Sequence, residues 1–299
     1  MLFTVIICTY EREELLEITL ETLDRQRLDR RHWQTLVVDN AGRARTREVA
    51  AKWDVGYVYE PREGLSHARN RGFKEVATDW VVYLDDDIRA PETLLEAFYN
   101  CILATDGAAV GGYFKHWFRT PAPDWLMKYY ATPYRASMAT VRTRLTDGQY
   151  LPGCVLAVQR RMLEEIGGFH PRLGMQGKQI GHAEEDHLQN QLRRRGYDVY
   201  FDPEIWIDHL VQPYKYTLGA RYRMAHSHGR ASVYLDEAEA GMSWYELLAV
   251  GARITFYSVP FNIARWLFKP GYVWQHMFVD SITKYCYAWG RYTASRGKA

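Results

Sequence analysis

The sequence predicts an α/β fold in which a mostly parallel sheet is flanked by helices, with a helical extension at the C-terminus. Two observations predict the sheet: short apolar runs alternate with helical patterns through the first hundred residues, and acidic or polar residues follow several of these runs. Strand–helix alternation of this kind builds a parallel sheet covered on both faces. A third observation, a change of composition from about residue 243, predicts the extension.

Four apolar runs in the first hundred residues are predicted to form buried strands. They are mostly continuous rather than alternating and contain many β-branched residues, as expected where both faces of a sheet are covered. The runs occupy residues 2–10, 34–40, 55–60 and 79–84.

The segments that follow these runs are predicted to be helices, because apolar residues recur in them at helical spacing. In the third segment Ala68, Gly72 and Val76 fall on one face. Pro91 stands near the start of the fourth, where proline is tolerated. The helices are predicted at residues 13–26, 46–53, 65–77 and 90–102.

After residue 107 the alternation is less regular. Residues 115–150 have little periodicity and many aromatic, proline and arginine residues, so we expect loops and short helices there. A glycine pair ends one predicted helix, and Gly196 separates another from the strand that follows. The predicted elements are strands at 108–114 and 151–158, a helix at 160–169 and a helix–strand pair within 182–203.

The composition narrows the class of protein. The 299 residues, 47% of them hydrophobic, suffice for one large domain with an appendage. Because 38 basic residues nearly balance 36 acidic ones, no basic field attracts nucleic acid, and we expect no nucleic-acid partner. No signal peptide is expected, and the absence of an 18-residue apolar run predicts no membrane-spanning helix. The four cysteines are far apart and are interpreted as buried thiols in a reducing compartment: Cys8, Cys101, Cys154 and Cys286.

Polar and acidic side chains stand at the ends of three of the predicted strands. Ligands of open α/β sheets bind beyond the carboxyl ends of the strands. A single Asp there is also a common cap or turn residue, which remains an alternative for Asp39. A triple Asp exceeds what a cap needs, and its mutual repulsion favours a bound divalent cation, Mn²⁺ or Mg²⁺. The strand-end residues are Thr9, Tyr10 and Glu11; Asp39 and Asn40; and Asp85, Asp86 and Asp87.

The acidic cluster also indicates the kind of ligand. A cation held by one or two protein carboxylates completes its coordination shell with substrate phosphates, so the site is predicted to bind a nucleoside diphosphate. The carboxylate of Asp39 would suit the edge of a base. The sequence has neither G-x-x-x-x-G-K-[ST] nor G-x-G-x-x-G. This argues against a P-loop NTPase and a dinucleotide-binding dehydrogenase.

Six segments in order resemble glycosyltransferase family 2, whose members have the Rossmann-like GT-A fold. The resemblance covers residues 2 to about 211. It rests on the ordered series rather than on any single motif. The segments are "VIICTYER", "LVVDN", "GLSHARNRG", "VVYLDDD", "LPGCVLAVQRRMLEEIGGF" and "EED…LRRRGYDVYFDPEIWIDH".

The resemblance implies roles for particular residues. The D-x-D pair is Asp85 and Asp87, with Asp87 the direct metal ligand and Asp85 near both the metal and the ribose. His209 matches a histidine that approaches the metal or the diphosphate. Asp86 is then the variable middle residue, and we expect it to tolerate Ala or Ser. The nucleotide-binding residues implied by the resemblance are Thr9, Tyr10, Glu11, Asp39, Arg69, Asn70 and Asp85.

A second acidic cluster opens the helix near residue 184. Acids at a helix N-terminus also suit the helix dipole, so a structural role is one interpretation. An inverting sugar transfer needs a carboxylate that takes the proton of the acceptor hydroxyl. Counting back from "LRRRGY" places this base at Glu185, where many family members have Asp. Asp186 is the base if the register slips by one, and Glu184 is the third option.

Two segments keep two interpretations each. The aromatic residues within 116–144 form either an acceptor lid, because aromatic rings stack on sugars, or a second small core. The tail from Trp244 holds 14 of the 43 aromatic residues, and from Arg253 it has seven basic residues against one acid. It either contacts a bilayer interface or packs against the catalytic domain or a homodimer partner. The aromatic residues of the first segment include Trp117, Trp125, Tyr129, Tyr130 and Tyr134.

The predicted function is an inverting, metal-dependent transfer of a sugar from a UDP-, GDP- or dTDP-sugar to a hydroxyl of a glycan or lipid-linked acceptor. Polysaccharide or glycolipid synthesis is the expected setting, in the cytoplasm or at the cytoplasmic face of a membrane. The predicted domains are a catalytic domain at 1–240, with halves at 1–107 and 108–240, and an extension at 241–299.

Two alternatives of different classes remain. A sugar-nucleotide nucleotidyltransferase would need a Gly/Arg-rich loop after the first strand, which "CTYERE" does not supply. A non-catalytic glycan- or nucleotide-binding protein on the same scaffold would not need Asp85, Asp87 and Glu185.

Overall fold

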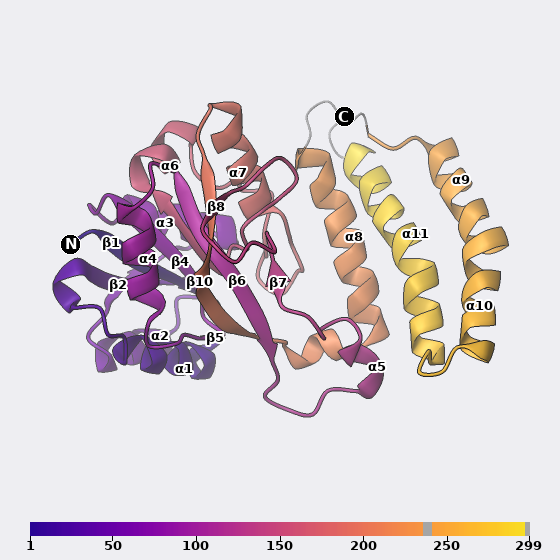
Figure 1. Cartoon of the computed structure of the whole chain (residues 1–299), viewed down its shortest axis with the longest axis horizontal. Coiled ribbons are helices and arrows are strands. Elements are labelled where there is room, and N and C mark those ends of the chain that lie inside the picture. The colour runs from indigo at the N-terminus through magenta and orange to yellow at the C-terminus, as the bar shows by residue number, and fades with distance from the viewer. Residues whose placement is uncertain (236–240, 297–299) are drawn as a thin grey trace. The chain divides into compact units, whose positions relative to one another are not determined.

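The computed structural model describes residues 1–235 and 241–296, which fall into two compact units (Figure 1). We call them the sheet unit and the helical unit. The predicted domain boundary at residue 240 lies outside the described residues, and the boundary at 107 stays a prediction. The sheet unit comprises Met1–Trp117, Thr132–Gly177 and Glu184–Leu210, and the helical unit comprises Phe118–Ala131, Lys178–Ala183 and Val211–Ala299.

The sheet unit contains a single sheet, which has ten strands within the described residues. Its main path runs β3-β2-β1-β4-β9-β6-β10-β5, and the short strands β7 and β8 pair with β6 and β10. The first four strands are parallel, β9 is antiparallel to both of its neighbours, and β6 and β10 are parallel to each other. The mostly parallel α/β fold predicted from the sequence is therefore confirmed. The strands are β1 (Phe3–Thr9), β2 (Trp33–Asp39), β3 (Gly56–Tyr59), β4 (Trp80–Asp85), β5 (Ile88–Arg89), β6 (Ala109–Trp117), β7 (Tyr134–Arg135), β8 (Thr143–Arg144), β9 (Val155–Gln159) and β10 (Val199–Leu210).

Helices cover both faces of this sheet. Apolar side chains of α1, α2 and α4 join one buried core, and those of α3, α6 and α7 join the other. Successive residues of a strand serve the two cores in turn: Val5 and Ile7 belong to the first and Ile6 to the second. This explains why the strands are continuous apolar runs. The helices of the unit are α1 (Glu13–Asp24), the short η1 (Arg30–His32), α2 (Ala44–Lys52), α3 (Leu65–Lys74), α4 (Leu94–Leu103), α6 (Arg160–Ile166) and α7 (Glu184–Arg194).

The register of the parallel strands brings their carboxyl ends together. Thr9 at the end of β1 is paired with Asp39 at the end of β2, and Cys8 is paired with Asp85 at the end of β4. The side chains that follow these strands therefore meet at one edge of the sheet.

A glycine allows the backbones of β6 and β10 to approach closely. The register of this pair shifts between Phe201 and Trp206, where the strand bulges. A Cβ atom on Gly112 would lie only 1.7 Å from the carbonyl oxygen of Ile205. Because that obstacle is backbone, the bulge requires glycine at this position.

The helical unit is built around three long helical segments, with α11 between α8 and the continuous α9–α10 segment (Figure 1). Where α8 and α11 meet, a Cβ on Gly229 would lie 1.9 Å from the Tyr287 carbonyl oxygen, so this crossing requires a residue without a side chain. The elements are α5 (Asp124–Met127), η2 (Pro213–Tyr216), α8 (Leu218–Leu235), α9 (Trp244–Arg253), the π-helical η3 (Ile254–Ser258), α10 (Val259–Phe268) and α11 (Trp274–Arg296).

Part of the aromatic segment 116–144 packs within the helical unit. The carbonyl of Trp125 lies 2.7 Å from Nε2 of His276, and the Tyr129 hydroxyl donates to Asp280. Leu126 between them is fully buried. These contacts are those of a small core, the second of the two interpretations, whereas Tyr134 in β7 belongs to the sheet unit.

The α9–α10 segment differs from the sequence expectation. Trp244–Phe268 is a continuous helix of 25 residues whose most apolar window has a mean hydropathy of 1.3 and is 17% buried. By length and composition it could cross a membrane. The sequence pattern predicted no such helix because Glu246, Gly251 and Arg253 interrupt the apolar residues.

We predict that Gly112→Ala destabilises the sheet unit, because the added methyl group forces the two backbones apart. The expected loss is about 1–3 kcal/mol of unfolding free energy, measured by urea denaturation. Gly148→Asn is the control, since nothing lies within 4 Å of a Cβ at Gly148 and Asn tolerates its φ of +79°. Equal stability of Gly112→Ala and the wild type would contradict the described contact.

Candidate functional site

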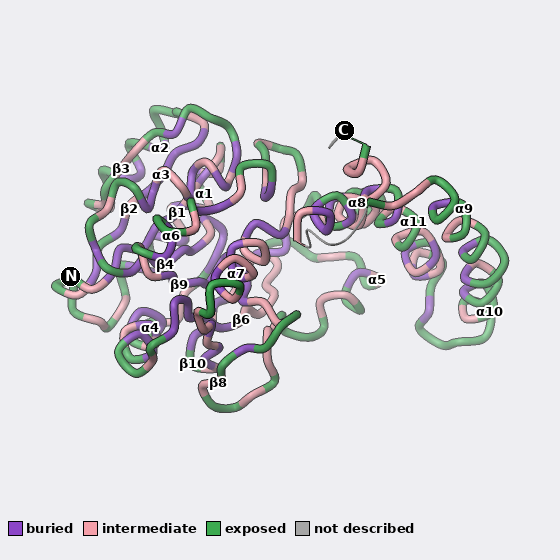
Figure 2. Tube along the Cα trace, turned by 90° about the horizontal axis from the view of Figure 1, so that it is seen from above, coloured by how far each residue is buried: buried purple, intermediate pink, exposed green. Residues whose placement is uncertain are grey.

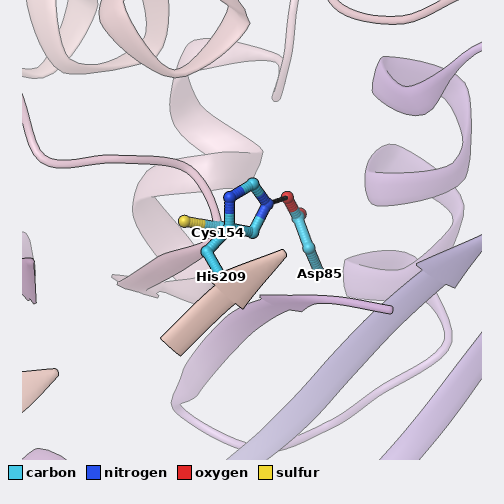
Figure 3. A group of neighbouring side chains, drawn as sticks. All are labelled: Asp85, Cys154 and His209. Atoms are coloured by element: carbon cyan, nitrogen blue, oxygen red, sulfur yellow. Dashed lines mark ion pairs between the residues drawn. The ribbon is translucent and has the colours of Figure 1, made fainter. Parts of the chain in front are cut away.

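The end of β4 carries the centre of the candidate site. Nε2 of His209, near the end of β10, lies 3.1 Å from Oδ1 of Asp87 and 3.5 Å from Oδ2 of Asp85. Figure 3 shows the imidazole of His209 directed at the Asp85 carboxylate, with the thiol of Cys154 beside it. The ligand atoms of Asp85, His209 and Cys154 all lie within 4.8 Å of one another. The structure thus brings Asp85 and Asp87 to His209, and these are the three residues predicted to hold a metal.

This donor set suits a hard divalent cation. Carboxylate oxygens and an imidazole nitrogen are ligands that Mn²⁺ accepts, and Mg²⁺ prefers the oxygens. The Cys154 thiol is a poor candidate at neutral pH, because burial and then the charges of Asp85 and Asp87 raise its pKa well above the ordinary value. Asp85, Asp87 and His209 therefore fit the cation better than any set that includes the thiol.

The charge of Asp85 is balanced from two sides. Burial alone would raise its pKa, but the hydrogen bond from His209 and the charge of Arg69 lower it below the ordinary value. Nη2 of Arg69 lies 3.3 Å from Oδ1 of Asp85. Both neighbours therefore favour the charged form of Asp85.

Arg69 connects this centre to the second acidic cluster. Its side chain is 3% exposed, and its Nη1 donates to Oε1 of Glu184 at 2.9 Å, while Nη2 donates to the carbonyl of Gly153 at 3.2 Å. Burial alone would lower the pKa of Arg69, but Glu184 and Asp85 raise it. One guanidinium therefore ties the end of β4 to the start of α7.

Asp86 is placed differently from the sequence expectation. It is 3% exposed and accepts hydrogen bonds from the Thr9 hydroxyl at 2.7 Å and from Nη1 of Arg12 at 3.2 Å. Burial raises its pKa to about 6, although Arg12 opposes the shift. Asp86 therefore holds the loop after β1 against the loop after β4. The expectation that Asp86, as the variable middle residue, tolerates Ala or Ser took no account of these buried hydrogen bonds and stays a prediction.

The loop after β1 contains two more predicted residues. The Tyr10 hydroxyl donates to Oε2 of Glu63 at 3.2 Å. Glu11 has a φ of +54°, a left-handed conformation that is uncommon outside glycine. A strained residue held in place next to a cluster of charges is typical of functional loops.

Asp39 and Asn70 contact their own chain rather than open space. Asp39 is fully buried, and its two oxygens accept from the backbone N–H groups of residues 41–43 and from the hydroxyl of Tyr57. Asn70 exchanges two hydrogen bonds of 2.8 Å with the backbone of Phe169. In this structure Asp39 shapes the loop after β2, and Asn70 ties α3 to the end of α6.

The three acids of α7 have three different surroundings. Glu184 is buried against Arg69, and burial together with Glu185 raises its pKa well above the ordinary value. Burial and Glu185 raise the pKa of Asp186 to about 7, while Arg193 opposes the shift. Oε2 of Glu185 is buried and has no hydrogen-bond partner among the described residues. Among the described residues, Glu185 thus carries a carboxylate oxygen of α7 that is removed from water and still unsatisfied.

Gly153 permits Glu185 and Arg69 to approach each other. A Cβ atom at Gly153 would lie 3.0 Å from Nη1 of Arg69 and 3.3 Å from Cβ of Glu185. The glycine of the "PGC" segment before β9 therefore leaves room for the Arg69 side chain beside Glu185.

Comparison with known protein families assigns the chain. The model described as "Glycosyl transferase family 2" matches residues 4–167, more than half of the sequence. The chain belongs to glycosyl transferase family 2. It is therefore a transferase enzyme, and the nucleotidyltransferase and non-catalytic alternatives lose their support.

Curated relatives of this family 2 glycosyltransferase include two that align over most of its length. "Succinoglycan biosynthesis protein ExoM" of Rhizobium meliloti is 25% identical over 263 residues, which cover 84% of this chain and 81% of the relative. "Glycosyltransferase AglE" of Haloferax volcanii is 22% identical over 227 residues, covering 74% and 71%.

Solved structures of transferases share the fold. The mannosyltransferase PcManGT of Pyrobaculum calidifontis, in complex with GDP-Man and Mn²⁺, has a TM-score of 0.60 at 21% identity and covers 94% of this chain and 85% of its own. TarS of S. aureus in complex with UDP-GlcNAc has a TM-score of 0.56 at 12% identity, covering 100% and 92%. These likenesses confirm the GT-A fold of the family 2 chain.

Arg12 and Cys154 are the site residues that sequence reasoning missed. Arg12 pairs with Asp86 at 3.2 Å and lies 3.6 Å from Asp87. Its position directly after Glu11, opposite a predicted triple Asp, was a signal for the counter-charge. Cys154 gave no signal, because an isolated cysteine at the start of a strand is most often a core residue.

We predict that Asp86→Ala destabilises this transferase by about 1–3 kcal/mol, because the Thr9 hydroxyl and the Arg12 guanidinium lose a buried acceptor. Urea denaturation measures the change. The control is Asp24→Ala, which removes an exposed ion pair with Arg30 and should change stability by about 0–1 kcal/mol. If the two variants are equally stable, Asp86 is not the structural link described here.

Proposed function

We propose that this glycosyltransferase moves a sugar from a nucleotide-diphosphate sugar to a hydroxyl group, with a divalent cation and with inversion at the anomeric carbon. The observation that carries the proposal is the convergence of Asp85, Asp87 and His209 at the carboxyl edge of a GT-A sheet. The two nucleotide sugars named for PcManGT and TarS support this donor class.

The donor side of the site lies at the ends of β1, β2 and β4. Thr9, Tyr10 and Glu11 are proposed to border the nucleotide, with Asp39 shaping the adjoining loop. Arg69 and Asn70 lie in α3, which Asn70 ties to the end of α6, and Arg69 adds a positive charge next to Asp85. The UDP-, GDP- and dTDP-sugars remain the candidate donors.

The metal is proposed to bind Asp87, Asp85 and His209. When bound, Mn²⁺ or Mg²⁺ would neutralise the charge of the departing diphosphate. The contribution of this chain is to hold the three donors close together before binding: Arg69 orients Asp85, and the backbone N–H of Leu210 donates to the Asp87 carbonyl at 3.0 Å. Preorganised ligands avoid an entropic cost at the moment of binding.

Glu185 is proposed as the general base. Its unsatisfied buried oxygen can accept the proton of the acceptor hydroxyl, whereas the oxygen of Glu184 is already bound by Arg69. Removing this proton as the hydroxyl attacks the anomeric carbon opposite the leaving diphosphate gives inversion. Asp186, next to Glu185 on α7, is the second candidate.

The acceptor is proposed to be a glycan or a lipid-linked glycan. ExoM is named for the biosynthesis of a polysaccharide, succinoglycan, which supports an acceptor of this class. In the sheet unit Tyr134 stacks on Phe114 with ring centroids 5.2 Å apart, and Phe114 lies 5.0 Å from the ring of His209. This aromatic group suits the apolar face of a sugar ring. We place the enzyme in the cytoplasm, at the membrane where lipid-linked acceptors lie.

We predict that Glu185→Gln lowers kcat by about 10²–10⁴-fold and leaves donor affinity unchanged, because only the proton acceptor is lost. Product formation and donor titration by calorimetry measure the two quantities. Asp186→Asn is the matched control and should keep most of its activity. The opposite pattern would assign the base to Asp186.

Asp186→Asn should also alter the pH dependence of stability. The pKa of Asp186 is raised in the folded protein to about 7, from an ordinary value of 3.8. The raised pKa therefore stabilises the fold fully below about pH 4, and this contribution is lost as the pH rises through 7. Asn mimics the protonated acid, so the variant should be more stable than the wild type above pH 7 and equal to it near pH 4. If the unfolding free energies of the two proteins differ by the same amount at every pH, the raised pKa of Asp186 is contradicted.

We predict that Mn²⁺ together with one nucleoside diphosphate raises the Tm, because a ligand that binds only the folded state stabilises it. UDP, GDP and dTDP are compared by thermal shift, each with and without Mn²⁺. Asp87→Asn should remove the Mn²⁺-dependent part of the shift. An equal rise in Tm with and without Mn²⁺ would argue for a metal-independent transferase. No rise in Tm with UDP, GDP or dTDP would argue against a nucleotide-diphosphate sugar as the donor.

A further inference from the structure

The α9–α10 helix is apolar on its exposed side, and its few buried positions hold two aliphatic and two polar residues. Its buried positions follow one stripe, Leu247, Ile254, Ser258 and Asn262, and α11 packs along it. In a helix at the surface of a water-soluble protein the large apolar residues face inward. In this helix most of the large apolar residues are exposed instead.

The inward stripe ends in a polar network. Nδ2 of Asn262 donates to the hydroxyl of Ser281 at 3.1 Å, and the hydroxyl of Tyr272 lies 3.1 Å from Oδ1 of Asn262 and 3.0 Å from Oδ2 of Asp280. Nη1 of Arg265 donates to the same Asn262 oxygen. Polar groups that pair with each other inside a helical layer leave its outer surface free to be apolar.

The outer surface is apolar on most sides and strongly exposed, and Figure 2 shows much of the α10 trace as exposed. The largest exposed fractions are 82% at both Phe256 and Phe268. An apolar helix surface of this extent is stable when a protein partner or a membrane shields it from water. Contiguous exposed apolar patches therefore mark interaction sites. The outer surface is defined by Trp244, Tyr245, Leu248, Phe256, Tyr257, Phe261, Ile263, Trp266, Leu267 and Phe268.

The charges around this outer surface indicate what covers it. Within residues 241–296 the exposed charged side chains are four basic residues and one acid, Glu246. Trp and Tyr beside Arg and Lys are the residues that prefer the boundary between lipid headgroups and acyl chains. The net positive charge complements anionic headgroups. The basic residues are Arg253, Lys269, Lys284 and Arg296.

Two of these basic residues also indicate the orientation. Arg253 lies near the middle of the α9–α10 helix, and Lys284 lies near the middle of α11, which packs beside it. If the two helices crossed a bilayer, both charges would be exposed near its centre, which is costly. In helices lying flat, both side chains can reach the headgroups.

We propose that the outer surface of α9–α10 binds flat in the headgroup layer of a bilayer that contains anionic lipid. The aromatic side chains insert between the lipids, and Arg253 and Lys284 pair with the headgroups. This inference depends only on the helical unit. It stands or falls separately from the proposed donor, metal and base.

Co-sedimentation of the full chain with vesicles tests the proposal. We expect binding to phosphatidylcholine vesicles with about 30 mol% phosphatidylglycerol, weaker binding to phosphatidylcholine alone, and loss of most of the difference in high salt. A blue shift of the tryptophan emission should accompany binding. No binding to the mixed vesicles, or equal binding to both kinds, would overturn the proposal.

A matched pair of variants assigns the binding to this surface. Phe256→Ser with Phe268→Ser changes two largely exposed residues, so the fold should persist, and vesicle affinity should fall by about tenfold or more. Met138→Ser is the control, because Met138 is 81% exposed and lies in the sheet unit. If Met138→Ser lowers vesicle affinity as much as the double variant does, or if the double variant leaves it unchanged, the outer surface of α9–α10 is not the membrane-binding site.

A second copy of the chain is the competing occupant. Sedimentation velocity without lipid distinguishes it, because a dimer that dissociates on Phe256→Ser with Phe268→Ser would show that the surface is a protein interface and overturn the proposal. We expect the wild type and the double variant to have the same oligomeric state in detergent, while their vesicle affinities differ.

Discussion

The candidate site depends on one buried guanidinium. Arg69 of α3 is 3% exposed and contacts the Asp85 carboxylate, the Glu184 carboxylate and the carbonyl of Gly153. These three groups come from segments of the chain that are far apart in sequence. Without the positive charge, the buried carboxylate of Glu184 would be unpaired in a low-dielectric interior, at a cost of several kcal/mol, and the half-buried Asp85 would keep only His209. The end of β4 and the start of α7 can therefore be close together only because Arg69 lies between them.

This arrangement separates the charges by role. Asp86 accepts hydrogen bonds from Arg12 and Thr9 and fixes two loops, while Asp85 and Asp87 converge on His209. On α7 the carboxylate of Glu184 is paired with Arg69, which leaves Glu185 with an unsatisfied oxygen. In both clusters one acid serves the structure and its neighbour is left for chemistry. Different surroundings give adjacent acids different pKa values, so chemically identical carboxyl groups can differ in protonation at the same pH.

Much of the sheet could be predicted because its apolar strands and amphipathic helices are local patterns, and the ends of parallel strands must share an edge. The grouping of Asp85, Asp87 and His209 followed from the ordered motifs. The partners of Asp39, Asp86 and Asn70 could not be predicted, because each depends on a residue or backbone group brought close by folding. For the same reason the sequence did not show that the thiol of Cys154 lies beside Asp85 and His209.

The sequence by itself determined the parallel core, the family and the residue types at the carboxyl edge, because these depend on periodicity and on motif order along the chain. Tertiary structure decided which acids are buried, which are paired and which remain unsatisfied, because burial and pairing depend on distances between segments. It also decided that Trp244–Phe268 exposes its aromatic residues and buries Leu247, Ile254, Ser258 and Asn262. Composition alone cannot show that direction, since the same residues could equally have faced a core.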